Sequence, residues 1–487
     1  MSDLLRPENI INRLAIEITE DRILNAEEDP IQPIMDIIHG SVMKYDIATT
    51  RVGLKAVMDR TIEIIESIDS DGKDVIPKRL CDHFKRVSKL TVSKMDEEST
   101  VEVIRNLRNF GKSAVERELK YATCQATESL VVIGKASAER EFEDATWRVV
   151  QSLAVFVGET AIEREFEFAI IAVIWSLRDV GRIAAEKGLE DATSGVASFL
   201  EFIGKTVAEK GKGFGDVTSD VAYSLGVVGE NAAEKGKELE DATEQAAKSL
   251  GVIGTIAAEK GGEFEDATIC AVESLEVVGK IAARNELGKA VERALESLGQ
   301  IGITAAQNGL RDAAANAAMD LVFFGRFEIE KRNEYTAIQV IRFLEKIGKI
   351  AAEKGEELEP VAWQAAESLG RVGVDAAMEG EKFKNVANEV IFRLGFVGRY
   401  TEGAGLEEAT KQVAQSFVWI GVLATESGLD GAAQEAAKCL AAILNKKLVE
   451  QAIHESESEL RAYYDSFQKF LDLYEHELEE PQPRKPD

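Results

Sequence analysis

The stretch DATEQAAKSLGVIGTIAAEKG, residues 241–261, is one copy of a unit that recurs from about residue 100 to about residue 445. Each copy carries a glycine directly after Ile, Val or Phe. These glycines are residues 111, 134, 158, 181, 204, 229, 254, 279, 302, 325, 348, 373, 398 and 421, so the spacing stays between 23 and 25 residues. A short and nearly constant period of this kind is typical of a repeat protein.

Each copy of the unit predicts one α-helix. The apolar residues of the copy at 241–261 are spaced four, four, three and four residues apart, which places them on one face of a helix. They are Ala242, Ala246, Leu250, Ile253 and Ala257. We therefore expect a succession of helices of about 20 residues, each roughly 30 Å long.

The residues at the two ends of the copy predict where the helix begins and ends. Asp241 is the expected N-cap, and the acidic residues before it complement the positive end of the helix dipole. Lys260 followed by Gly261 is typical of a helix end, because glycine readily adopts a left-handed conformation. Pro360 occupies the place of Asp241 in a later copy, where a helix start tolerates proline.

Small residues form a strip along the helix: Ala247, Gly251, Gly254 and Ala258. We interpret the strip as the place where neighbouring helices approach one another closely. A phosphate-binding glycine loop would need a preceding strand, and the pattern contains none. The alternative is that Gly254 divides each unit into a longer and a shorter helix, since glycine lowers helix stability by roughly 1 kcal/mol.

The segments AAKSLGVIG (246–254), AVESLEVVG (271–279) and AAESLGRVG (365–373) resemble the first helix of HEAT-like repeats of the phycobilisome-lyase type. The resemblance implies protein–protein interaction, in some relatives a lyase or chaperone-like role, and no transferable catalytic residues. The period departs from that family, because two-helix repeats are longer than 23–25 residues.

The periodicity predicts an all-α fold, an α-solenoid in which antiparallel helices form a superhelical stack. Connections this short favour antiparallel neighbours. Three regions follow from the change in pattern along the chain: an N-terminal helical region at 1–100, an array of about fourteen units at 101–445, and a C-terminal amphipathic capping helix with a polar tail at 446–487.

The composition favours protein partners over nucleic acid. Lys and Arg number 58 against 87 Asp and Glu, which gives a net charge of −29 at pH 7. So acidic a chain is poorly suited to neutralising a phosphate backbone, and a basic protein or peptide is the expected partner. No apolar run is long enough to span a membrane, and the N-terminus lacks a signal-peptide pattern. With four widely separated cysteines, these features predict a cytoplasmic protein.

A basic cluster precedes the array: Lys78, Arg79, Lys85, Arg86, Lys89 and Lys94. It is a predicted binding site for an acidic partner or for the acidic array of a second copy. The alternative is that these side chains form the solvated face of one helix. Cys81 and His83 lie within the cluster, but a metal site would need two further ligands nearby, and none is evident.

Tryptophans occur at helical positions of the array: Trp147, Trp175, Trp363 and Trp419. We expect most of them to be buried. An exposed tryptophan would instead be a peptide anchor, because aromatic side chains dominate the energetics of many interfaces.

The pattern changes after Leu444. The apolar and aromatic residues there, spaced alternately four and three apart, are Leu460, Tyr464, Phe467, Leu471, Tyr474 and Leu478. We predict one long amphipathic helix that caps the last exposed face of the solenoid. The alternative is a coiled coil that forms a homodimer, since the same spacing is its contact pattern.

The sequence contains no convincing catalytic or cofactor-binding motif, and no serine lies in a G-x-S-x-G elbow. We therefore predict a non-enzymatic scaffold, without a cofactor, that binds a protein or peptide on an extended acidic surface. The alternatives are a self-assembling structural protein that forms dimers or filaments and an enzyme or cofactor-binding protein that uses the solenoid groove.

Overall fold

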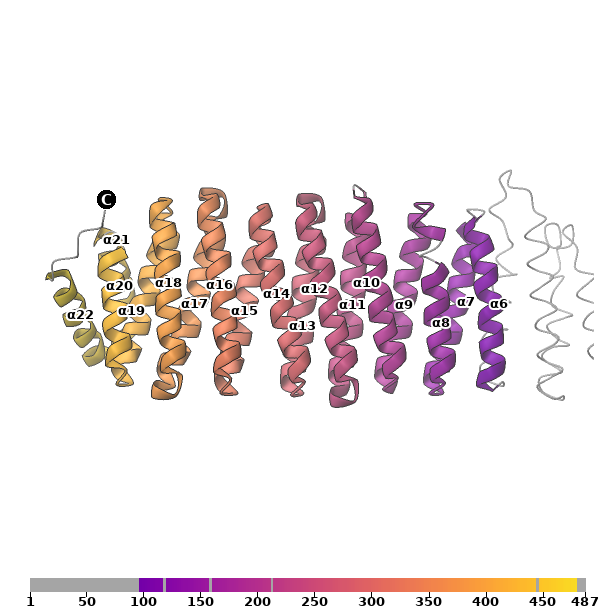
Figure 1. The fold of residues 1–487 in the computed structure, drawn as a ribbon, viewed down its shortest axis with the longest axis horizontal. Coiled ribbons are helices and arrows are strands. Elements are labelled where there is room, and N and C mark those ends of the chain that lie inside the picture. Colours follow the sequence, from indigo (N-terminus) through magenta and orange to yellow (C-terminus); the bar gives the residue numbers. More distant parts are fainter. Residues whose placement is uncertain (1–95, 117–119, 157–159, 212, 444–445, 480–487) are drawn as a thin grey trace, which may run out of the picture. The chain divides into compact units, whose positions relative to one another are not determined.

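The computed structural model describes residues 96–116, 120–156, 160–211, 213–443 and 446–479. These residues form α-helices joined by short turns and 3-10 helices, and no strand occurs among them (Figure 1). Their contacts divide them into two units. Unit 1 comprises the described residues up to 210 together with 223–249, and unit 2 comprises 211–222 and the described residues from 250 onward.

The α-helices are α6 (Glu97–Glu116), α7 (Lys120–Glu139), α8 (Glu143–Phe156), α9 (Glu167–Lys187), α10 (Glu190–Lys210), α11 (Gly215–Lys235), α12 (Glu240–Lys260), α13 (Glu265–Arg284), α14 (Gly288–Asn308), α15 (Arg311–Glu330), α16 (Glu334–Lys354), α17 (Glu359–Met378), α18 (Lys384–Gly403), α19 (Glu407–Glu426), α20 (Asp430–Ile443), α21 (Lys446–Glu457) and α22 (Tyr464–Glu479). The 3-10 helices are η3 (Gly236–Leu239), η4 (Gly262–Phe264), η5 (Glu356–Leu358), η6 (Gly380–Phe383) and η7 (Leu460–Tyr463).

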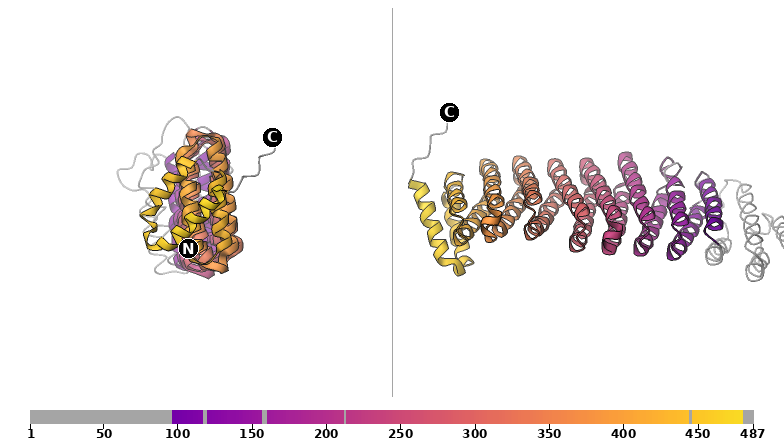
Figure 2. Two further views of the ribbon diagram at one scale, coloured as in Figure 1. Left: turned by 90° about the vertical axis from the view of Figure 1, so that its left-hand side faces the viewer. Right: turned by 60° about the horizontal axis from the view of Figure 1, so that its bottom comes forward.

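The helices of each unit are arranged in two layers. From α13 to α20, each helix of unit 2 packs against the next helix and against the next but one, and α6–α10 of unit 1 follow the same rule. Even-numbered helices therefore form one layer of a unit and odd-numbered helices the other (Figure 2). This is the all-α solenoid that the period predicts. None of the described helices has the length and apolar character of a membrane-spanning segment.

The repeating glycine lies inside a continuous helix. Helix α12 runs from residue 240 to 260 without a break at Gly254, so the alternative of two shorter helices is wrong. A Cβ atom at Gly254 would lie 2.4 Å from Cδ1 of Ile301 and 2.9 Å from Cβ of Ala271. The close approach of α12 to α14 thus requires glycine here. Residues 254 and 301 are 47 apart, so the structural repeat is a pair of helices.

The helix starts differ from the prediction. Helix α12 begins at Glu240, so Asp241 lies in its first turn and is not the N-cap. In the neighbouring α13 the N-cap is Phe264, whose side chain makes no capping hydrogen bond. Instead, the buried hydroxyl of Thr243 donates to the Leu239 carbonyl at 2.8 Å, and Thr268 bonds to Phe264 in the same way. In these two helices, burial of the preceding apolar residue thus takes the place of a polar cap, whereas α16 has a polar N-cap, Asn333, whose side chain accepts a hydrogen bond from the Thr336 amide.

The helix ends follow the prediction more closely. Gly261 has φ +86° and ψ −158°, a combination that favours glycine, and Pro360 lies in the first turn of α17. At four other turns among the described residues, a charged residue has a positive φ, which strains a side chain with a Cβ. These are Glu141, Glu165, Glu286 and Arg332.

The C-terminal segment is not one long helix. Helix α21 ends at Glu457, and a turn with the 3-10 helix η7 precedes α22. Helix α22 packs on α19 and α20 at the end of unit 2, drawn in yellow in Figure 2. Its Phe470 ring lies where a Cβ of Gly421 would be, 2.0 Å away. The predicted boundaries at residues 100 and 445 stay predictions.

The predicted apolar stripe is only half buried. Leu460, Phe467 and Tyr474 are buried, whereas Leu471 is half-buried and Tyr464 and Leu478 are 59% and 44% exposed. Besides Phe467 and Tyr474, the buried face of α22 includes Phe470 and Glu477. At 100° per residue, this face is rotated about the helix axis by roughly 60° from the face that the spacing predicts. The rotation arises because α22 packs on two helices at once, which the spacing alone does not reveal.

Candidate functional site

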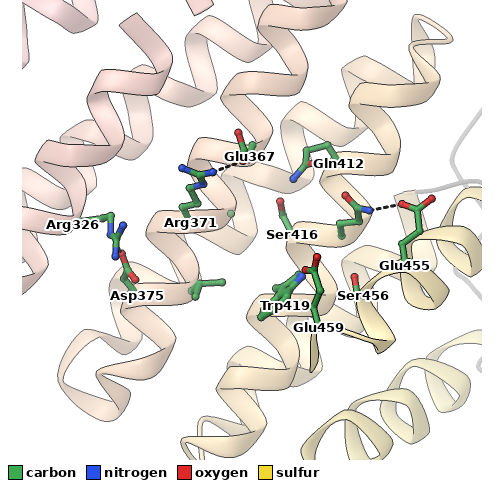
Figure 3. Close-up of a pocket in the computed structure, with 13 residues that line it drawn as sticks. Arg326, Glu367, Arg371, Asp375, Gln412, Ser416, Trp419, Glu455, Ser456 and Glu459 are labelled. Carbon is green, nitrogen blue, oxygen red and sulfur yellow. Dashed lines mark hydrogen bonds and ion pairs between the residues drawn. The ribbon is translucent and has the colours of Figure 1, made fainter. Parts of the chain in front are cut away.

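Outward-facing side chains of unit 2 line a groove of about 560 Å³ (Figure 3). It crosses the odd-numbered layer, where α15, α17, α19 and α21 follow one another. The lining residues are Arg326, Glu367, Gly370, Arg371, Val374, Asp375, Gln412, Gln415, Ser416, Trp419, Glu455, Ser456 and Glu459. All of them lie within unit 2.

The repeat itself positions these side chains. The residue six places before the repeating glycine is exposed in the helices from α9 to α16 and in α18, but half-buried in α17 and α19, where it is Glu367 and Gln415. Close packing forms the floor of the groove: a Cβ at Gly370 would lie 2.3 Å from Oγ of Ser416. The Ser416 hydroxyl donates to the carbonyl of Ala366 at 3.3 Å.

Carboxylates outnumber guanidinium groups in the groove. Glu367, Asp375, Glu455 and Glu459 line the groove together with two guanidinium groups, those of Arg326 and Arg371. Lys411 of α19 also pairs with Glu455, at 3.5 Å, so one negative charge remains in excess. Arg371 Nη2 lies 2.7 Å from Glu367 Oε1, and Gln415 Nε2 donates to Glu455 Oε2 at 2.6 Å. Glu459 lies beside Trp419 (Figure 3). The groove therefore favours a cationic guest.

Asp375 and Ser456 place buried polar atoms in the groove. Oδ2 of Asp375 forms an ion pair with Nε of Arg326 at 2.6 Å. Burial raises the pKa of Asp375 above its ordinary value, although Arg326 opposes the shift. Among the described residues, the buried hydroxyl of Ser456 has no hydrogen-bond partner. An unsatisfied buried group is costly, so this hydroxyl would gain from a polar guest.

The tryptophans are less buried than predicted. Trp175 is 49% exposed, and Trp147, Trp363 and Trp419 are half-buried. Trp419 belongs to the groove and lies beside Glu459 (Figure 3). The sequence singled out Trp419 but not its environment. The contributions of Glu455 and Ser456 were missed, because they come from α21, which lies beyond the regular period.

The other predicted site residues are placed as follows. The basic cluster from Lys78 to Lys94 lies outside the described residues. The C-terminal stripe is split between a buried and an exposed row, so its role in capping or dimerisation stays a prediction. Burial raises the pKa of Cys270 to about 11, and that of Cys439 likewise, so both thiols are protonated at neutral pH. In the part of the chain that the structure describes, no cluster of His, Cys, Asp and Glu could hold a metal ion.

Periodicity and architecture together give one firm classification. The chain is a helical repeat protein. No family model matches it, and no curated protein matches it. Several solved structures show a distant likeness.

One is a circular tandem repeat protein with a novel repeat topology and enhanced subunit contact surfaces. It is 17% identical over 93% of this chain and 99% of its own, with a TM-score of 0.42. Another is the karyopherin Kap121p bound to the extreme C-terminus of the protein phosphatase Cdc14p, 12% identical over 97% of this chain and 53% of its own, with a TM-score of 0.38. Kap121p by itself is 11% identical over 98% of this chain and 56% of its own, with a TM-score of 0.36. The chain thus spans about half the length of the karyopherin chains.

Proposed function

We propose that this protein is an interaction scaffold whose groove in unit 2 binds a basic, extended segment of a partner protein. The observation that carries the proposal is the excess of carboxylates around the half-buried ring of Trp419. The groove offers charge complementarity to Lys or Arg, an aromatic surface for an apolar or cationic side chain, and the buried Ser456 hydroxyl, which has no hydrogen bond among the described residues. It offers binding, and nothing in the proposal requires turnover.

The ion pairs already present in the groove are weak obstacles to a guest. Arg371 is 57% exposed in its pair with Glu367, and Arg326 is 55% exposed in its pair with Asp375. Exposed pairs of this kind stabilise a protein by only about 0 to 1 kcal/mol, so a guest cation can exchange with them at little cost. Trp419 lies deeper and is the expected energetic centre of the site.

The test measures the binding of a fluorescein-labelled peptide in which Lys and Arg alternate with Leu. We expect Trp419→Ala to weaken binding at least tenfold, because loss of a central aromatic side chain removes most of the contact surface. The double variant Glu455→Gln/Glu459→Gln should weaken binding severalfold and reduce its salt dependence. Trp175→Ala is the matched control, since this exposed tryptophan of α9 lies outside the groove. Equal binding by wild type and Trp419→Ala, or no binding by wild type, would contradict the proposal.

Self-assembly is the second candidate, and it is favoured by the outward row of α22. Tyr464, Leu471 and Leu478 are seven residues apart and leave apolar surface exposed or half-exposed at the end of unit 2. In this proposal Leu460, Phe467 and Tyr474 cap the array while the outward row contacts a second copy. Light scattering should then give a mass that rises with concentration, and Tyr464→Glu/Leu478→Glu should abolish the rise. A constant monomer mass for wild type would exclude self-assembly.

A further inference from the structure

The even-numbered layer of unit 2 carries a surface of opposite character on α16 and α18. Within a strongly acidic chain, cations and aromatic rings are concentrated there. We define this cationic aromatic patch as Arg342, Lys346, Lys349, Phe392, Arg393, Phe396, Arg399 and Tyr400. Two contacts join the helices across it: Arg393 Nη1 lies 2.9 Å from Glu345 Oε2, and Lys349 Nζ lies 4.9 Å from the centre of the Tyr400 ring.

Positive charge exceeds negative charge on the patch. The five cations face three carboxylates, Glu345, Glu353 and Glu389, which leaves a net charge of +2. Arg393 binds two of these carboxylates by itself, and Lys349 pairs with the third. Arg342, Lys346 and Arg399 are exposed, and within the described ranges none of them pairs with a carboxylate. These cations are available to an anionic partner.

The aromatic rings make the patch partly apolar, but their faces are occupied. Phe392 is 52% exposed and meets Phe396 edge to face, with ring centres 4.9 Å apart. Arg393 lies over the Phe392 ring at 5.5 Å, and Arg399 lies over the Phe396 ring at 5.3 Å. Only ring edges and the outer side of Phe392 therefore remain for contact with a partner.

We propose that the cationic aromatic patch binds an acidic peptide segment that also carries apolar side chains. Carboxylates of the segment would pair with Arg342, Lys346 and Arg399, and an apolar side chain would cover Phe392. Charge complementarity supports this occupant, because at physiological salt charges interact over only about 8 Å, so a short segment responds to the patch and not to the whole chain.

Single-stranded nucleic acid fits the same patch less well. Such ligands bind by stacking bases on aromatic faces, and here a cation already covers one face of each of Phe392, Phe396 and Tyr400. A long phosphate backbone would also extend beyond the patch over a chain of net charge −29. The inference goes beyond the proposed function, since the patch differs from the groove in charge and in layer. Unit 2 would then join a basic segment on one side to an acidic segment on the other.

The test uses the full chain and two fluorescein-labelled probes. One is a peptide of about twelve residues in which Asp and Glu alternate with Leu and Phe, and the other is a single-stranded oligothymidine. We expect the acidic peptide to bind, Arg342→Glu/Lys346→Glu to weaken it at least tenfold, and Phe392→Ala to weaken it severalfold. Lys248→Glu is the matched control, because Lys248 and Arg342 both lie exposed six residues before a repeating glycine. Its affinity should change less than twofold.

The remaining outcomes separate this inference from its competitors. Binding of the basic peptide at the Trp419 groove should be unchanged in Arg342→Glu/Lys346→Glu, which also shows that the variant is folded. Stronger binding of oligothymidine than of the acidic peptide would overturn the proposal, as would equal affinity of wild type and the double variant for the acidic peptide. A dimer that sediments as a monomer only after the double substitution would show that the patch contacts a second copy instead.

Discussion

Two positions of the same repeat differ in how much they vary. The repeating glycine recurs in helix after helix and lies against a branched or aromatic side chain of the next helix but one: Val180 faces Gly134, Val228 faces Gly181, Ile301 faces Gly254, Phe324 faces Gly279 and Ile420 faces Gly373. The residue six places earlier varies widely in type, and examples are Trp175, Tyr223, Lys248, Glu273, Met319, Arg342, Phe392 and Gln415. The inner position determines the fold, and the outer position carries the chemistry of the surface.

The two layers of unit 2 show what the outer position can achieve. Helix α17 and the segment of α21 present carboxylates around Trp419 of α19, whereas α16 and α18 present arginine and lysine around phenylalanine and tyrosine. The backbone and core are alike in both layers. A repeat of this kind can therefore acquire opposite binding properties on its two sides without any change in packing.

The largest effect is expected from a substitution at the inner position. A Cβ at Gly373 would lie 2.5 Å from Cδ1 of Ile420 and 2.8 Å from Cγ1 of Val390. Gly373→Val should therefore force α17 away from α19 and lower the free energy of unfolding by about 3 kcal/mol, as overpacked cores do. Urea denaturation followed by circular dichroism measures the change.

Gly403 provides the control for this experiment. It is the last residue of α18, and a Cβ there would meet nothing within 4 Å. Gly403→Ala should change the free energy of unfolding by less than about 0.5 kcal/mol. If both variants were equally stable, the close approach of the helices at the repeating glycine would not be what the fold requires.

The second prediction concerns a buried carboxyl group between the inner and outer positions. Asp320 of α15 is buried beside Glu276 and Glu273, with Lys280 also close, and burial followed by repulsion from Glu276 raises its pKa from 3.8 to about 8. Between about pH 4 and pH 8 the folded protein thus holds a proton that the unfolded chain has released. The stability should fall as the pH rises through this window, and the loss should be complete above pH 8.

Asp320→Asn tests this because the amide keeps the shape of the side chain and cannot ionise. At pH 9 the variant should have a higher free energy of unfolding than wild type, and the difference should shrink as the pH falls and vanish near pH 4, where Asp320 is protonated in the folded and in the unfolded chain. Urea midpoints measured from pH 4 to pH 9 give both slopes. Parallel slopes for the two proteins would show that Asp320 is ionised in the folded state.

Much of the fold could be predicted from the sequence, because the inner positions repeat. Their period predicts the helices, their length and their ends at residues such as Gly261. The caps could not be predicted: Asp241 has the right chemistry, but burial of Leu239 fixes where the helix begins, and burial depends on tertiary packing. The prediction of which face of α22 is buried was only half right for the same reason, since Phe470 packs on Gly421 of α19, almost fifty residues earlier in the chain.

The binding surfaces could be predicted only in outline. The sequence correctly indicates an excess of negative charge, but the net charge of the whole chain conceals the cationic aromatic patch on α16 and α18. Groups such as Trp419 and Glu455 come from different copies, so only the packing of the helices shows that they lie together. The sequence does contain one signal: the residue six places before each repeating glycine lies on the outer side of its helix, so comparing these residues between copies would have indicated how the surface chemistry varies.

A smaller effect is expected at the threonine that bonds to the start of its helix. The Thr410 hydroxyl is buried and donates to the Leu406 carbonyl at 2.6 Å. Thr410→Val removes this bond without a large change in volume, and the same carbonyl keeps its bond from the Thr410 amide. We expect the free energy of unfolding to fall by about 1 kcal/mol.

Thr206 is the outward counterpart of Thr410. Its hydroxyl makes the same type of bond, to the Phe202 carbonyl at 2.7 Å, in an exposed setting. Water can replace that bond, so Thr206→Val should leave the urea midpoint almost unchanged. An equal loss in both variants would mean that burial does not determine the contribution of this hydrogen bond.

The smallest effect is expected at the turns, where neither the core nor the binding surface is involved. Glu286, after α13, has φ +58°, whereas Gly309 occupies the corresponding turn after α14 with φ +78°. A left-handed conformation strains any residue that has a Cβ, by roughly 1 kcal/mol. Glu286→Gly should therefore raise the free energy of unfolding by about 0.5 kcal/mol, since part of the gain is offset by the greater freedom of glycine in the unfolded chain.

The reverse substitution at the neighbouring turn gives the opposite sign. Gly309→Ala introduces the strain that Glu286 already tolerates and should lower the free energy of unfolding by about 1 kcal/mol. Thermal melts of the two variants, compared with wild type, should shift in opposite directions. Because the two turns share one backbone conformation, shifts in the same direction would mean that side-chain contacts of Glu286, such as its ion pair with Lys331 at 3.3 Å, outweigh the backbone strain.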